Sequence, residues 1–346
     1  MDDNLKNTDE RIPWVDACKG IGIVFVVLGH IARGYEGAWL FPDYQQVLIR
    51  LGNYAYAFHM TLLFLLSGFV FYQAYSPDRQ PEKDHYIGQL LNLVWIFLLY
   101  SVLWWAVKQF FPDQINIKLT VSDLVCFLIR PLDPYWYLWV LFFYYLFFYY
   151  ADKRNVQEKW IWAVVITLSL AGSVFRIAGL EAFRKLFFYA TPFYMGIYLS
   201  KHNFVRRLGK QIWAVCGVVS VAAMSFITAT GKDLDMISIV EIVAALAISI
   251  FIIMSVTHIY FLENSRFLNL CGKYSLEIYV LHNYITAANR LILIKLGITE
   301  FYMNVVINFF MAVMIPVCIG MVLKKAGLYP FFFKPGRFYK GRHSLG

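Results

Sequence analysis

The chain has 346 residues, of which 60% are hydrophobic and only 15% are charged. Soluble domains carry about 25% charged residues, so this composition excludes a water-soluble globular protein and indicates a surface that faces lipid. The formal net charge of +9 does not indicate a nucleic-acid partner, because Lys and Arg gather in short polar gaps between apolar runs, as they do in the loops of membrane proteins.

Neither the N-terminal segment nor the cysteines of the chain indicate a functional site. The N-terminus MDDNLKNTDER is acidic and polar, unlike the basic start of a signal peptide, so the first apolar run is predicted to be a retained helix. The cysteines are scattered, and no CxxC or Cys/His pair at metal-ligand spacing occurs. Neither a disulfide framework nor a metal site is therefore predicted.

Apolar runs long enough to cross a bilayer, which takes about 17–25 residues, follow one another along the chain. About ten transmembrane helices are predicted, at 18–34, 52–75, 89–111, 134–150, 160–175, 186–200, 211–229, 236–260, 275–294 and 300–323. An interfacial helix is predicted at 121–130. The fold class is thus an all-α integral membrane protein, with one domain over 1–346 made of an N-terminal segment 1–17, a helical core 18–323 and a short basic tail 324–346.

The polar gaps also predict an orientation. With the N-terminus inside, the inner stretches are 1–17, 76–88, 151–159, 201–210, 261–274 and 324–346, and these hold most of the Lys and Arg. Cytoplasmic loops carry such an excess. Both termini are therefore predicted to be cytoplasmic.

Ionisable residues inside the first spans are the first candidates for function, because such residues are costly in a membrane. Lys19 and His30 are eleven positions apart, which places them on nearly one helix face and roughly 16 Å apart along the axis. Spacing alone does not decide between a functional pair and a snorkelling Lys with a helix-packing His. His59 opens the second span near the depth of His30, whereas Ser67 and Gly68 lie two turns deeper, where helix packing is the favoured role.

Further candidates lie later in the chain. Glu241 is about one turn inside the eighth span, near the level of His30. In the ninth, His282 is expected near mid-membrane, and Glu277 lies near the inner surface, where it could be solvated. Three charged residues on the outer side could hold an anionic or sugar ligand: Arg130, Arg176 and Arg184. Each of them is also typical of a solvated helix end.

Several of these residues form an ordered set of motifs. The set comprises Trp14-Val-Asp16-Ala-Cys18-Lys19-Gly20 through Gly29-His30, Phe58-His59-Met60 through Ser67-Gly68-Phe69, Trp136-Tyr-Leu-Trp139, Pro192-Phe-Tyr-Met-Gly196, and Gly272-Lys-Tyr-Ser275 through His282. Over residues 14 to about 283 the set resembles acyltransferase family 3, the multi-spanning O-acyltransferases of bacterial surface polysaccharides. The residues of its first two motifs are most similar to those of the fucose-acetylase-like branch. The sequence departs from that branch at Thr61, where Pro is usual, and at His85-Tyr86-Ile87, where arginines are common. The esterase-like domain fused to some members is absent.

The resemblance implies a reaction in the bacterial plasma membrane. Acetyl-CoA, or another acyl-CoA, would donate its acyl group from the cytoplasm to a hydroxyl of an extracytoplasmic or lipid-linked sugar or polysaccharide. No metal would take part. Lys19 would hold a CoA phosphate, with Ser67 and His282 along the donor channel. His30 would be the general base, with Glu241 as its first orienting partner and His59 as the second. Trp136, Arg130, Arg176 and Arg184 would contact the acceptor.

A rival interpretation is a membrane transporter or flippase for a small molecule or glycan, which would also line a cavity with His and Glu. No internal repeat favours it. A non-catalytic scaffold is disfavoured because Lys19 and His30 are both present. The acceptor, the acyl group and the oligomeric state, including a homo-oligomer, stay open, as does the need for a partner protein.

Overall fold

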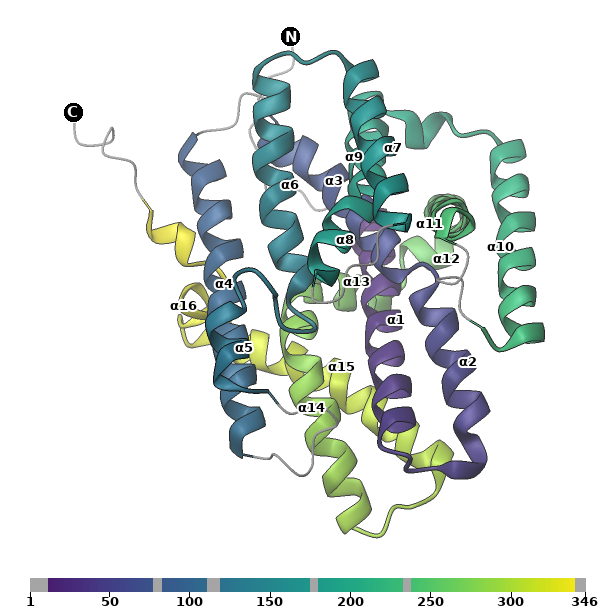
Figure 1. The fold of residues 1–346 in the computed structure, drawn as a ribbon, viewed down its shortest axis with the longest axis vertical. Helices are drawn as coiled ribbons and strands as arrows, with labels where there is room; N and C mark the ends of the chain where they lie inside the picture. The colour runs from purple at the N-terminus through teal and green to yellow at the C-terminus, as the bar shows by residue number, and fades with distance from the viewer. Residues whose placement is uncertain (1–11, 77–82, 111–118, 175–179, 233–237, 340–346) are drawn as a thin grey trace.

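The computed structural model describes residues 12–76, 83–110, 119–174, 180–232 and 238–339. Every regular element in these ranges is a helix (Figure 1), which confirms the predicted all-α fold class. The elements are α1 Pro13–Gly37, η1 Pro42–Tyr44, α2 Gln45–Tyr56, α3 His59–Tyr75, α4 Lys83–Phe110, α5 Val121–Cys126, α6 Trp136–Lys153, α7 Glu158–Val174, α8 Glu181–Phe188, α9 Ala190–Lys201, η3 Phe204–Arg207, α10 Lys210–Thr230, α11 Ser238–His258, α12 Tyr260–Glu263, α13 Arg266–Lys273, α14 Ser275–Lys295, α15 Phe301–Lys325, α16 Tyr329–Phe333 and η5 Pro335–Phe338.

Several helices are suited to cross a membrane. Among the described residues, six segments are long and apolar enough: Pro13–Gly37, Pro42–Tyr75, Lys83–Phe110, Lys210–Thr230, Ile239–His258 and Phe301–Lys325. The other predicted spans are also helical, but α7 has 17 residues and α9 has 12, α6 is rich in Tyr, and α14 contains Glu, His, Asn and Arg. The chain is a multi-pass membrane protein, and the count of ten spans with both ends inside stays a prediction.

The central and peripheral helices differ in burial. Within the most apolar window of each, 78% of the Pro42–Tyr75 segment is buried, against 22% of α10. Figure 1 shows α10 at one edge of the bundle and α4 at the opposite edge. The side chains of Val215, Val218 and Val221 on α10 are exposed, so this face is suited to contact lipid acyl chains.

Glycines allow two pairs of helices to approach closely. A Cβ added at Gly68 on α3 would lie 1.9 Å from the carbonyl oxygen of Phe193, and one at Gly196 on α9 would lie 1.9 Å from that of Leu65. A Cβ added at Gly272 on α13 would likewise lie 1.8 Å from the carbonyl oxygen of Asp16 on α1. This confirms the packing role predicted for Gly68, since small residues let helix backbones approach in membranes.

The structure changes some predicted boundaries. Helix α1 begins at Pro13 and continues to Gly37, beyond the predicted limits of 18 and 34. The predicted span 52–75 is interrupted, because α2 ends at Tyr56 and α3 begins at His59 after Phe58 leaves helical geometry with φ −148°. The predicted interfacial helix is shorter, Val121–Cys126, and it begins at a capping box formed by Thr120 and Asp123.

Glu277 is not solvated, contrary to the alternative considered above. It is buried, at 1% exposure, and its Oε1 lies 3.3 Å from Lys324 Nζ on α15. The hydroxyl of Tyr329 on α16 donates to the same oxygen at 2.9 Å. The paired carboxylate therefore ties α14 to the C-terminal helices.

Candidate active site

A cavity of about 510 Å³ lies among α1, α2, α3, α4, α6, α8, α11, α14 and α15. On α1 its lining residues run from Val26 to Tyr35, so it occupies the half of that helix that is remote from Lys19. The cavity brings together five of the residues predicted from the sequence: His30, His59, Trp136, Arg184 and Glu241.

His30 stands at the centre of a group of rings. Its side chain is half-buried, and its ring centroid lies 5.0 Å from that of His282 on α14 and 6.0 Å from that of Tyr56 on α2. The Tyr56 ring in turn lies 4.9 Å from that of His59. Within the described residues His30 makes no hydrogen bond, so both of its nitrogens are available to a substrate or to a neighbour.

The two flanking imidazoles have fixed protonation sites. His59 Nδ1 lies 2.5 Å from the carbonyl oxygen of Ala55, and His282 Nδ1 lies 2.8 Å from that of Tyr279. A carbonyl only accepts, so each Nδ1 carries the hydrogen and donates, which leaves Nε2 as the acceptor of the neutral ring. His282 Nε2 is buried and has no hydrogen-bond partner in the part of the chain that the structure describes.

Local structure explains these positions. The break between α2 and α3 places Ala55 one turn before His59, so the side chain of His59 satisfies a carbonyl at the end of α2. The loop before α6 is held against α14, because the hydroxyl of Tyr279 donates to the carbonyl of Pro134 and that of Tyr135 to the carbonyl of Val280 at 3.1 Å. These contacts position Trp136 at the cavity wall.

Charged side chains around the cavity come from several helices. Lys185 on α8 lies 3.6 Å from Asp133 and 4.2 Å from the ring centroid of Trp136. Arg184 pairs with Glu181 at 2.9 Å. Helix α8 contacts α6, α7 and α9 near the middle of the bundle (Figure 1), which is how a short helix brings two cations to the site.

His282 lies beside His30 and not well below it, as its predicted depth implied. The reason is that α1 continues to Gly37, past the predicted end at 34, so His30 is about one turn further from the helix end than expected. Glu241 lines the cavity, but no hydrogen bond joins it to His30 in the described residues.

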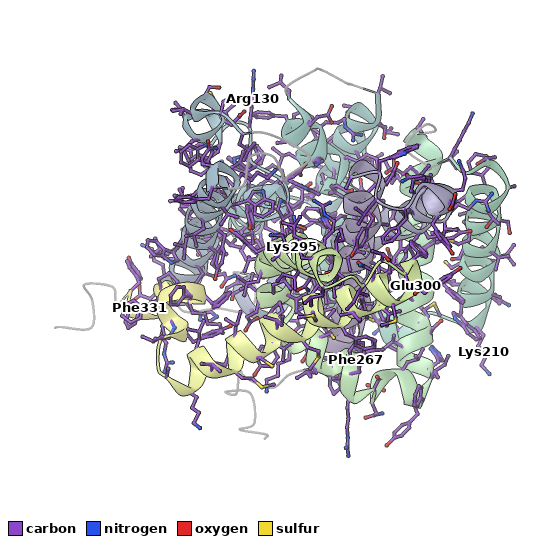
Figure 2. All side chains as sticks on the ribbon, turned by 90° about the horizontal axis from the view of Figure 1, so that it is seen from below. Arg130, Lys210, Phe267, Lys295, Glu300 and Phe331 are labelled. Carbon is purple, nitrogen blue, oxygen red and sulfur yellow. The ribbon has the colours of Figure 1, made fainter. Side chains whose placement is uncertain are left out.

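The other predicted site residues lie elsewhere. Lys19 is half-buried outside the cavity. The hydroxyl of Ser67 is 2.6 Å from that of Tyr137 and does not line the cavity. Arg130 is exposed and lies at the rim of the bundle in Figure 2, away from the cavity. Arg176 falls outside the described residues.

Several lining residues were not anticipated from the sequence. Arg33 and Arg290 lie inside predicted spans, so the rule that singled out His30 would have found them. Tyr56, Asp133 and Lys185 carry no such signal, because aromatic and charged residues are common at the ends of spans. Within the described ranges, no group of three or more His, Cys, Asp or Glu residues is arranged to hold a metal ion.

The chain matches a known protein family over most of its length. A family model described as an acyltransferase domain matches residues 12–325, and that range includes Lys19 and every residue that lines the cavity. No curated protein and no solved structure matches the chain.

Proposed function

The chain belongs to acyltransferase family 3, and from that premise we propose that it transfers an acyl group, acetyl in the first instance, from cytoplasmic acyl-CoA to a hydroxyl of an extracytoplasmic or lipid-linked sugar or polysaccharide. The observation that carries this proposal is the placement of His30, which has no hydrogen-bond partner among the described residues, in a cavity beside an imidazole of fixed tautomer. An imidazole nitrogen that makes no other hydrogen bond can accept the proton of a substrate hydroxyl, which suits general-base work.

In the proposed reaction His30 takes the proton of the acceptor hydroxyl as its oxygen attacks the thioester carbon. A C–O ester bond forms and the C–S bond breaks. CoA leaves as a thiolate, and the proton held by His30 passes to it. All atoms and charges balance without a covalent enzyme intermediate, so neither Ser67 nor a cysteine needs to act as a nucleophile.

His282 is proposed as a positioning residue for His30. Its Nε2 accepts a hydrogen bond once the N–H of His30 turns toward it, which the centroid separation of 5.0 Å allows. That bond would leave the other nitrogen of His30 free to accept the proton. Glu241, which lines the same cavity, and His59 remain candidates for orienting the His30 ring. The part proposed for His282 replaces its predicted place along the donor channel.

The remaining assignments follow from where the residues lie. Lys19, near the start of α1, is proposed to hold a CoA phosphate at the inner surface, and Ser67 stays a candidate for the donor channel. Trp136 and Arg184 both line the cavity, and both are proposed to contact the acceptor sugar. With ten transmembrane helices and both termini in the cytoplasm of a bacterial cell, Lys19 would lie toward the inner surface of the plasma membrane and the cavity toward the outer surface. The two substrates would then reach the protein from opposite sides of the membrane.

The test uses the full chain purified into nanodiscs. Release of CoA thiol from acetyl-CoA is measured with and without a panel of sugar acceptors, and acyl transfer to the sugar is followed by mass spectrometry. Acceptor-dependent thiol release that is lost in a His30→Ala variant is expected. Sugar uptake by proteoliposomes with no thiol release under any condition would favour the transporter instead.

A further inference from the structure

Helices α6 and α7 follow each other in the chain but pack mainly on other helices. Only residues 154–157 separate them, and this loop lies at one end of the bundle (Figure 1). Helices joined by so short a loop usually pack on each other. Here α6 packs on α4, whereas α7 packs on α8 and α9. A groove of about 710 Å³ is left between α6 and α7.

The wall of this groove is apolar along its length and ends in an arginine. Its lining residues are Phe143, Leu146, Phe147, Tyr150 and Ala151 on α6, Arg154 and Val156 in the loop, and Trp160, Ile161 and Val164 on α7. Phe147 and Val164 are 46% and 43% exposed, so the described part of the chain does not cover them. In a bilayer such a groove fills with hydrocarbon, because an empty space forfeits the dispersion contacts of its lining.

The groove has about the length of one membrane leaflet. Phe143 and Arg154 are eleven positions apart, which is roughly 16 Å along a helix. Half of a hydrocarbon core is about 15 Å thick. Tyr150 and Trp160, near the loop, are the residue types that gather at the membrane interface. An acyl chain that fills the groove would therefore place its headgroup at Arg154.

Arg154 is suited to hold a phosphate. Its side chain is exposed, and its guanidinium makes no hydrogen bond or ion pair within the described ranges. Lys153 and Lys159, which flank it in the chain, are exposed too. Lys and Arg clustered beside a transmembrane helix attract anionic lipid headgroups, and a planar guanidinium matches the geometry of a phosphate.

The carboxylates next to the loop do not pair with Arg154. Asp152 accepts a hydrogen bond from the hydroxyl of Ser76, just after α3. Glu158 lies 3.4 Å from Lys201 Nζ on α9. Each acid thus binds another element of the bundle, and Arg154 is left to an external anion.

We infer that one anionic phospholipid binds here, with an acyl chain in the groove between α6 and α7 and its phosphate at Arg154. In the predicted orientation this lipid belongs to the inner leaflet. The site does not depend on the proposed acyl transfer. A second copy of the chain is the other possible occupant, but a phospholipid combines an apolar chain of this length with an anion at its end in one molecule.

The experiment measures lipid retention by the full chain purified in detergent. Dioleoyl phosphatidylglycerol and dioleoyl phosphatidylcholine are added in competition, and native mass spectrometry counts the lipids that each protein molecule keeps. One phosphatidylglycerol per chain is expected, with a preference of about fivefold over phosphatidylcholine, the value of one cation near an anionic headgroup. Glycerol 3-phosphate, which resembles the headgroup but has no acyl chains, should not displace it.

Two variants test the two ends of the site. Arg154→Gln should abolish the preference for phosphatidylglycerol and leave the retention of phosphatidylcholine unchanged. Val164→Phe, which adds bulk inside the groove, should lower the retention of both lipids. Two matched controls should change neither quantity: Arg266→Gln, at an exposed arginine on the predicted inner side, and Val218→Phe, at an exposed valine of α10. Neither of these residues lines the groove.

Four results would overturn the inference. Equal retention of the two lipids, or an equal loss of preference in Arg154→Gln and Arg266→Gln, would remove the headgroup contact. Unchanged retention in Val164→Phe would place the acyl chain outside the groove. Displacement of the lipid by glycerol 3-phosphate would mean that the phosphate alone is bound. A lipid-free dimer that dissociates in Val164→Phe and not in Val218→Phe would assign the groove to a second copy of the chain.

Discussion

The rings of His30 and His282, which are far apart in the sequence, lie 5.0 Å apart from centroid to centroid in the middle of the bundle. His282 is tied to α14 by the bonds from its Nδ1 to the carbonyls of Ile278 and Tyr279, whereas His30 makes no hydrogen bond among the described residues. A ring of fixed tautomer thus stands beside an uncommitted ring, and the two are expected to act as a unit.

Replacing His30 by Ala is expected to lower acyl transfer by about 10²–10⁴, the usual contribution of a general base. Binding of acyl-CoA should be retained, because the cavity lies away from Lys19. Acceptor-dependent thiol release and equilibrium binding of acyl-CoA measure the two quantities separately.

His258→Ala is the matched control for that variant. His258 Nδ1 donates to the carbonyl of Met254 at 2.7 Å, in the same way as His59 and His282 donate, but it does not line the cavity. A loss of transfer in His258→Ala as large as that in His30→Ala would mean that any lost helical imidazole disables the protein, and would remove the specific role of His30.

Replacing His282 by Ala is expected to lower transfer less than His30→Ala does, because a positioning residue acts only through its partner. The decisive measurement is the double variant. If His282 works through His30, then adding His282→Ala to His30→Ala should cause little further loss, since effects within one catalytic unit are not additive. Losses that multiply would show that His282 acts independently of His30.

The fold was predictable where hydropathy alone decides it. Each predicted span is helical in the described residues, because apolar runs in lipid must satisfy their backbone hydrogen bonds internally. The break at Phe58 was not predictable, since the run around it stays apolar and aromatic on both sides. In the structure Phe58 leaves helical geometry and the ring of His59 bonds to the carbonyl of Ala55, and hydropathy carries no signal for either.

Which residues form the site was more predictable than how deep each of them lies along its helix. His30, His59 and Glu241 stand out as ionisable residues inside spans, and they do share one cavity. The depth of His282 was misjudged because an error of one turn in the end of α1 shifts His30 by about 5.4 Å. Asp133 and Lys185 reach the cavity from a loop and a short helix, and no periodic pattern in the sequence identifies such residues.

Replacing Gly68 by Ala is expected to lower the free energy of unfolding by about 1–3 kcal/mol, the usual cost of overpacking. The added Cβ would overlap the carbonyl of Phe193, a backbone atom that cannot rotate away. Thermal denaturation in detergent checks this. Gly209→Ala is the control, because nothing lies within 4 Å of a Cβ there, and an equal loss of stability in both variants would contradict the packing argument.

The orientation can be tested with reporter fusions after four described lysines. Fusions after Lys210 and Lys273 should report the cytoplasm, and those after Lys232 and Lys295 the outer side, because the stretches around the first pair carry the excess of Lys and Arg. The pair Lys273 and Lys295 brackets α14, which is less apolar than the other long helices. The same side for both would mean that α14 does not cross, and would reduce the number of spans.

Replacing Lys19 by Ala is expected to raise the KM for acyl-CoA by about tenfold to a hundredfold, which is the value of one charge-assisted contact to a phosphate. Lys19→Arg should retain much of the activity, since it keeps the charge. The KM for the acceptor should change little in either variant, because Lys19 does not line the cavity that contains His30. Lys210→Ala, at an exposed lysine on the predicted inner side, serves as the control. An unchanged donor KM in Lys19→Ala would leave this residue only as an anchor at the membrane surface, and a change in the acceptor KM alone would place the donor elsewhere.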